Sequence, residues 1–136
     1  MNVVIVSADH FFVGDDGVYR FNPRLLGAAH DMCRRNYWEA LDNPQVDVVV
    51  VDNTNTRTSK INDYVVEANR RNIKPVTIVR VICDVEKAVA RNSHGVPAGT
   101  VRDMWKRCNG MFDSFERNGM PPGWQDIEVM IIEGNV

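Results

Sequence analysis

The stretch from Val46 to Arg57 constrains the fold more than any other part of the chain, because a β-branched run there ends abruptly in polar residues. Val48 to Val51 are apolar at every position, which is typical of a strand buried on both faces in a parallel sheet covered by helices. Ligands of open α/β sheets bind outside the carboxyl ends of the strands. We therefore expect the polar residues after this strand to lie at a functional edge; the alternative is a turn that begins the next helix. These residues are Asp52, Asn53, Thr54 and Asn55.

A second run of the same character lies near the amino terminus. Val3 to Val6 is β-branched, and Ser7-Ala8-Asp9-His10 follows it directly. A carboxylate at a strand end can accept the proton of a hydroxyl nucleophile or hold a magnesium-bound water, so Asp9 is a candidate catalytic residue. The alternative is that Asp9 caps a helix or turn. Because adjacent strand positions point to opposite faces, we do not expect His10 to act on the same atom as Asp9.

Strand and helix patterns alternate along the rest of the chain. Asn22-Pro23 predicts the start of a helix, which Asp42-Asn43-Pro44 stops. Thr58 or Ser59 is the expected cap of the next helix, and Asp84 that of a later one. The first of these two helices is predicted to end at residue 72 and the second at residue 90, and a further helix is predicted over 98–115. Two more strands are predicted over 76–83 and 127–132. This alternation predicts one α/β domain over residues 1–136, a three-layer parallel sheet covered by helices.

The composition narrows the class of protein. The chain has 136 residues, of which 44% are hydrophobic, so it can bury a core without a disulfide or metal. The net charge of -2 argues against a general nucleic-acid coat protein. Three widely spaced cysteines, Cys33, Cys83 and Cys108, indicate buried or reduced thiols of a cytosolic protein. With neither a signal peptide nor a spanning segment in the pattern, we expect a cytoplasmic protein with no membrane partner.

Arg91 is the second candidate catalytic residue. It opens a break between two predicted helices that extends to Pro97. An arginine at such a corner can fold over a phosphate and stabilise developing charge; the alternative is an ordinary inter-helix turn. His94 has no second His or Cys at ligand spacing, so zinc is not expected. Arg107, on the following helix, either reaches phosphate or pairs with Asp103.

Four sequence blocks together resemble a known family. They are S-A-D-H-F-F, G-V-Y-R-F-N-P-x-x-L-x-x-A-H, V-V-V-D-N-T-N-T and R-N-S-H-G-V-P-x-x-x-V-x-x-M-x-x-R. In order and spacing they resemble the P-loop kinase-like family that includes polynucleotide 5′-hydroxyl kinases. The resemblance covers about Val3 to Arg107 and implies a P-loop NTPase-like fold.

The resemblance implies a role for each matching residue. Asp9 matches the general base that acts on the acceptor hydroxyl, and Arg91 matches a lid arginine that contacts nucleotide phosphates. Asp52 and Thr54 match the strand-end segment near the phosphates and magnesium, with Asp52 on the metal side. The implied cofactors are ATP and Mg²⁺, and the implied acceptor is a nucleic-acid 5′ end or a small hydroxyl compound. Phe12 stands where those kinases place an arginine for the substrate's phosphate, and His94 and Gly95 where they carry a further basic lid residue.

The chain also departs from the family in one large respect. Family members begin with a central strand and a G-x-x-x-x-G-K-[ST] loop that cradles phosphates, and this sequence contains no such motif. Three interpretations stay open. The chain is an incomplete or truncated phosphotransferase, whose missing strand a second chain can supply, or it is a non-catalytic relative that acts as a binding module. A third, in which the polar residues only cap helices, predicts no ligand at all.

Overall fold

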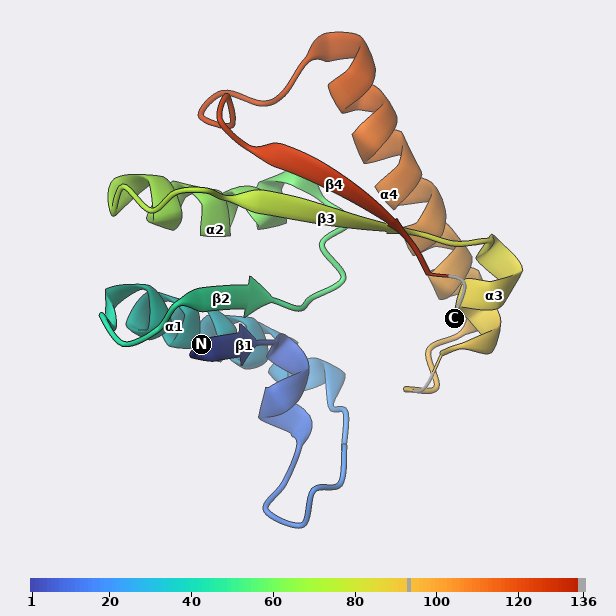
Figure 1. Cartoon of the computed structure of the whole chain (residues 1–136). Helices are drawn as coiled ribbons and strands as arrows, with labels where there is room; N and C mark the ends of the chain where they lie inside the picture. Colours follow the sequence, from blue (N-terminus) through green and yellow to red (C-terminus); the bar gives the residue numbers. More distant parts are fainter. Residues whose placement is uncertain (93, 135–136) are drawn as a thin grey trace. The chain divides into compact units, whose positions relative to one another are not determined.

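The computed structural model describes residues 1–92 and 94–134 (Figure 1). Strands and helices alternate along the chain, as the sequence predicts, and the fold is mixed α/β. The chain divides into two compact units, Met1–Thr54 and Asn55–Val136. Each unit combines a two-stranded parallel sheet with helices.

The first unit is built on two strands and one long helix. It contains β1 (Val3–Val6), the 3₁₀ helices η1 (Ala8–Phe12) and η2 (Pro23–Leu25), α1 (Leu26–Asp42) and β2 (Val48–Val51). β1 and β2 are parallel, and Val3 pairs with Val48 at one end and Val6 with Val51 at the other. Helix α1 contacts both strands.

The local sequence explains the helix of this unit. The Asn22 side chain accepts a hydrogen bond from Arg24 N at 3.0 Å, and Pro23 occupies the first helical position. The predicted start is therefore confirmed, with one 3₁₀ turn before the α-helix. The buried residues of α1 recur at intervals of three or four and form one face; they are Ala29, Cys33, Tyr37 and Ala40.

One expectation about these strands is wrong. Their residues alternate between a covered and an open face instead of being buried on both. Val48 and Val50 are each 40% exposed, and Val3 and Ile5 are about half exposed. A run of valines does not reveal this, because apolar residues at every position hide the alternation that marks a half-covered strand.

The second unit contains α2 (Thr58–Arg70), β3 (Thr77–Ile82), α3 (Val85–Ala90), α4 (Ala98–Asn118) and β4 (Glu128–Glu133). β3 and β4 are parallel and pair from Thr77 with Glu128 to Ile82 with Glu133. The buried core joins α2, α4 and the loop before β4; its members are Ile61, Val65, Met111, Phe112 and Trp124. Trp124 is fully buried, and its Nε1 donates a hydrogen bond to Asn62 Oδ1 at 2.8 Å.

The parallel pairing of the strands agrees with the predicted fold class. The prediction of one sheet that contains all the strands is not confirmed. In the described part of the chain, β1 pairs with β2 and β3 pairs with β4, which gives two small sheets. A single three-layer sheet therefore stays a prediction. Among the described residues, none of the helices combines the length and apolar character that a membrane span requires.

Candidate functional site

Asp9 lies directly after the carboxyl end of β1. Ser7 is the N-cap of η1, and its hydroxyl accepts a hydrogen bond from Asp9 N at 3.2 Å. This cap places Asp9 in the first turn of the 3₁₀ helix with an exposed side chain. The predicted position at a strand end is confirmed, and it is Ser7, not Asp9, whose side chain caps the turn.

The strand-based argument about His10 is wrong. Both Asp9 and His10 belong to η1 and not to a strand. Successive residues of a 3₁₀ helix are separated by about a third of a turn, so the two side chains do not point to opposite faces of a sheet. Both are exposed.

The segment after β2 is tied to the segment after β1. Asp52 N donates a hydrogen bond to Val6 O at 2.9 Å, which continues the strand pairing by one residue. Asn53 Oδ1 then accepts a hydrogen bond from Ala8 N at 2.9 Å, and its amide nitrogen lies 3.5 Å from Cys33 Sγ on α1. Asn53 therefore links both strand ends and the helix, whereas the neighbouring Asp52 and Thr54 are exposed.

Tyr19 also belongs to this site, although residue-by-residue analysis of the sequence did not select it. Its hydroxyl donates to Asp9 Oδ1 at 3.4 Å, a long contact. Burial, then the charge of Asp9, then this hydrogen bond raise the pKa of Tyr19 above its ordinary value. A bridge between Val13 and Tyr19 folds the intervening loop back, and this non-local pairing brings the phenol to Asp9.

Phe12 is a packing residue. It is buried, and its ring makes edge-on contacts with Phe11, Tyr19 and Phe21 at centroid distances between 5.1 and 6.1 Å. The side chain at this position therefore supports the loop that carries Tyr19. It is turned into the unit, whereas an arginine that binds a substrate phosphate must reach solvent.

Asn55 opens the second unit in a left-handed conformation, with φ of 50°. Asn tolerates this region better than most residues, so the polar segment turns here. Thr56 is buried, and its hydroxyl accepts a hydrogen bond from Arg107 Nη1 at 3.2 Å. The sequence predicted that Arg107 contacts phosphate or pairs with Asp103. It did not predict the hydrogen bond to Thr56.

The predicted helix caps at Thr58 and Ser59 are wrong. Arg57 occupies the N-cap position of α2, and no side chain makes a capping bond there. Asp84 occupies the N-cap position of α3 as predicted, also without a side-chain capping bond.

Arg91 lies at the end of α3, as its C-cap residue. Its side chain is exposed, and Nη1 donates a hydrogen bond to the carbonyl oxygen of Gly134, just beyond β4. The following corner is held by Asn92, whose Oδ1 accepts bonds from His94 N at 3.3 Å and Val96 N at 3.2 Å. Asn92 thus links the described residues on either side of this inter-helix corner, and contact of Arg91 with a nucleotide stays a prediction.

Asp9, Asp52, Asn53 and Thr54 belong to the first unit, and Asn55 and Arg91 to the second. The structure thus brings together the residues after β1 and β2. In residues 1–92 and 94–134, no group of three or more His, Cys, Asp or Glu side chains is arranged to hold a metal ion. A magnesium site at Asp52 would therefore need ligands from a bound phosphate, which is how Mg²⁺ is commonly held.

No protein-family model matches this chain.

Proposed function

We propose that this chain forms part of an ATP-dependent phosphotransferase, similar to polynucleotide 5′-hydroxyl kinases, that transfers the γ-phosphoryl group to a hydroxyl acceptor. The observation that carries the proposal is the hydrogen bond from Ala8 N to Asn53 Oδ1. It joins the S-A-D and D-N-T-N segments, two of the blocks on which the resemblance rests. It also lies at the carboxyl ends of two parallel strands, where ligands of α/β sheets bind.

In this proposal Asp9 is the general base. The acceptor hydroxyl gives its proton to the Asp9 carboxylate while its oxygen bonds to the γ-phosphorus of ATP. The bond from that phosphorus to the bridging oxygen breaks, and ADP leaves. An exposed carboxylate next to a phenol suits this role, because it is accessible to the acceptor and already oriented by Tyr19.

Asp52 and Thr54 are the proposed contacts for magnesium and the phosphates. Their side chains are exposed beside the segment that carries Asp9. Mg²⁺ is usually bound by one or two carboxylates together with substrate phosphates, so one aspartate is sufficient when ATP supplies the rest. Arg91 is the proposed lid residue, which requires its bond to the Gly134 carbonyl to open. The acceptor is a nucleic-acid 5′ end or a small hydroxyl compound.

A second chain is the proposed source of the phosphate loop. The sequence contains no G-x-x-x-x-G-K-[ST] motif. Within the part of the chain that the structure describes, β2 pairs with β1 and β3 pairs with β4, which gives two small sheets. A two-stranded sheet can be extended by an added strand from another chain.

Calorimetry with ATP and Mg²⁺ tests the nucleotide site. We expect no measurable affinity for this chain alone, and magnesium-dependent micromolar affinity once a strand with a phosphate loop is supplied by a second chain or by fusion. Asp52→Asn should abolish the magnesium dependence, whereas Asp47→Asn, in the same unit, should not. Tight binding of ATP by the chain alone contradicts the second-chain part, and no binding by any assembly contradicts the proposal itself.

A second candidate is a non-catalytic binding module. The exposed apolar face of Val3, Ile5, Val48 and Val50 favours it. It predicts a stable folded chain that binds a partner protein through this face. Val50→Lys should then abolish partner binding while leaving the fold intact, and no assembly should transfer phosphate.

A further inference from the structure

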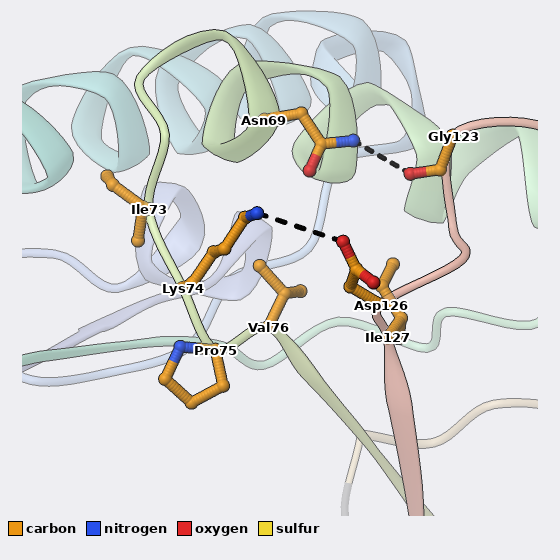
Figure 2. Close-up of a pocket in the computed structure, with 8 residues that line it drawn as sticks. All are labelled: Asn69, Ile73, Lys74, Pro75, Val76, Gly123, Asp126 and Ile127. Atoms are coloured by element: carbon orange, nitrogen blue, oxygen red, sulfur yellow. Dashed lines mark hydrogen bonds and ion pairs between the residues drawn. The ribbon is translucent and has the colours of Figure 1, made fainter.

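The second unit contains a pocket at the amino ends of β3 and β4, the opposite ends of these strands from Arg91 and Gly134. Its volume is about 230 Å³. Pockets for drug-sized ligands measure roughly 300–1,000 Å³, so this one suits a smaller molecule. Figure 2 shows residues from the end of α2, the approach to β3 and the loop before β4 gathered around it.

Two opposite charges lie side by side in the pocket. Lys74 Nζ is 3.7 Å from Asp126 Oδ2, near the outer limit for an ion pair, and both side chains are largely exposed. An exposed pair at this separation contributes little to stability, so exchanging it for contacts with a ligand costs little. In Figure 2 the two charged groups point toward each other across the pocket.

Asn69 adds an acceptor on the same side. Its Nδ2 donates a hydrogen bond to Gly123 O at 2.8 Å, which fixes the orientation of the amide. The carbonyl oxygen is therefore the atom left facing the pocket, as Figure 2 shows. Ile73, Val76 and Ile127, all half-buried, supply apolar lining next to these polar groups.

We propose that this pocket binds a free α-amino acid with an aliphatic side chain. The ligand's ammonium would be held by the Asp126 carboxylate and the Asn69 carbonyl oxygen, and its carboxylate by the Lys74 ammonium. An α-amino acid carries these two charges on one carbon, so it matches opposite charges held 3.7 Å apart. The aliphatic side chain packs on Ile73, Val76 and Ile127. Each charged group of the ligand faces an opposite charge of the pocket, so no charge is left unpaired in the complex.

Calorimetry on the full chain with L-leucine as the probe tests this assignment. We expect saturable binding with a dissociation constant of about 0.1–1 mM, as befits a ligand of few atoms in an open site. Isocaproate lacks the ammonium, isoamylamine lacks the carboxylate and glycine lacks the side chain. Each should bind at least about tenfold more weakly, because each loses one of the three contacts.

Two variants with matched controls locate the site. Lys74→Met and Asp126→Asn should each weaken leucine binding about tenfold or more. Lys60→Met and Asp113→Asn change residues of the same unit that are also exposed but lie outside the pocket, and should leave affinity within about twofold. All four should unfold at the wild-type temperature, since none removes a buried group. The proposal is overturned if leucine does not saturate at about 10 mM, if isocaproate or isoamylamine binds equally well, or if the controls weaken binding as much as the pocket variants.

Discussion

Asn53 accepts a hydrogen bond from Ala8 N at 2.9 Å across 45 positions of sequence. The bond extends the two-stranded sheet of the first unit by a side-chain contact beyond the last backbone pair. Ala8 is buried, so its N–H depends on this amide oxygen. The relationship makes Asn53 a positioning residue for the segment that carries Asp9.

Replacing Asn53 with Ala should therefore destabilise the chain. The buried Ala8 N–H loses its acceptor, which costs about 1–3 kcal/mol of unfolding free energy. Asn53→Asp retains an oxygen at this place and should cost less. Urea denaturation of both variants measures the difference, with Asn36→Ala on the exposed side of α1 as the control. Equal stability of Asn53→Ala and wild type would show that the bond is not formed in solution.

Tyr19→Phe should alter stability at alkaline pH and little else. The phenylalanine ring keeps the contact with Phe12, whose centroid is 6.1 Å away, and removes only the hydroxyl beside Asp9. Because the pKa of Tyr19 is raised in the folded state, the unfolded chain loses this proton first as pH rises. Tyr19 thus contributes stability that is complete below its ordinary pKa of about 10 and is lost as pH rises through the folded-state pKa.

Denaturant midpoints measured from pH 8 to about pH 11 check this sign. The wild type should lose more stability over this range than Tyr19→Phe. Tyr37→Phe, which removes the hydroxyl of a buried tyrosine on α1, is the comparison. A wild-type decline no steeper than that of Tyr19→Phe would contradict the raised pKa.

Particular residues show how far the sequence can predict this structure. The β-branched runs ending at Val6 and Val51 correctly predicted two strands, and Asn22-Pro23 correctly predicted a helix start. The polar residues after the strands do lie together, since parallel strands bring their carboxyl ends to one edge. What joins them was not predictable, because an amide such as Asn53 can serve a ligand or cross-link the backbone equally well.

Other features depend on contacts between distant segments. The open faces of β1 and β2 depend on which elements cover them, and local periodicity does not carry that information. The contact of Tyr19 with Asp9 depends on a loop closed by the bridge from Val13. Arg107 donates a hydrogen bond to Thr56, 51 positions away in sequence, although Asp103 lies one turn earlier on the same helix.

The Asp16 carboxyl, which is paired with Arg20, should titrate at an unusually acid pH. Arg20 Nη2 lies 2.7 Å from Asp16 Oδ2, and this contact, with a backbone bond from Val18, lowers the pKa of Asp16. A lowered pKa contributes stability that is present above the ordinary value of 3.8 and is lost as pH falls through the folded-state pKa. Carboxyl NMR shifts should show an Asp16 midpoint below the ordinary range. Arg20→Gln or high salt should return the Asp16 midpoint to the ordinary range, because both side chains are exposed and salt screens their attraction.

Trp124 and Asn62 test the core of the second unit. Trp124→Phe should destabilise the chain because it removes volume from a fully buried site and leaves Asn62 without its donor. Asn62→Leu leaves the indole N–H unpaired, at a cost of about 1–3 kcal/mol. If the bond carries the effect, the double variant should cost less than the sum of the two single changes in urea denaturation. Strict additivity would show that the two residues act independently.

Asp9→Asn separates the catalytic from the structural interpretation of the same residue. Asparagine keeps the shape and the exposure of the side chain but cannot accept the acceptor's proton. In an assembly that supplies a phosphate loop, phosphoryl transfer from ATP to a 5′-hydroxyl oligonucleotide should therefore fall by about 10²–10⁴-fold. Stability should stay within about 0.5 kcal/mol of wild type, since Asp9 is exposed and Ser7 makes the cap.

The matched control is Asp15→Asn, an exposed aspartate in the neighbouring loop of the same unit. It should leave both the rate and the stability unchanged. If both substitutions lower the rate equally, the effect comes from the charge of the loop and not from proton transfer. If Asp9→Asn lowers stability and leaves the rate intact, Asp9 is a structural residue of η1, and the general base must be sought elsewhere.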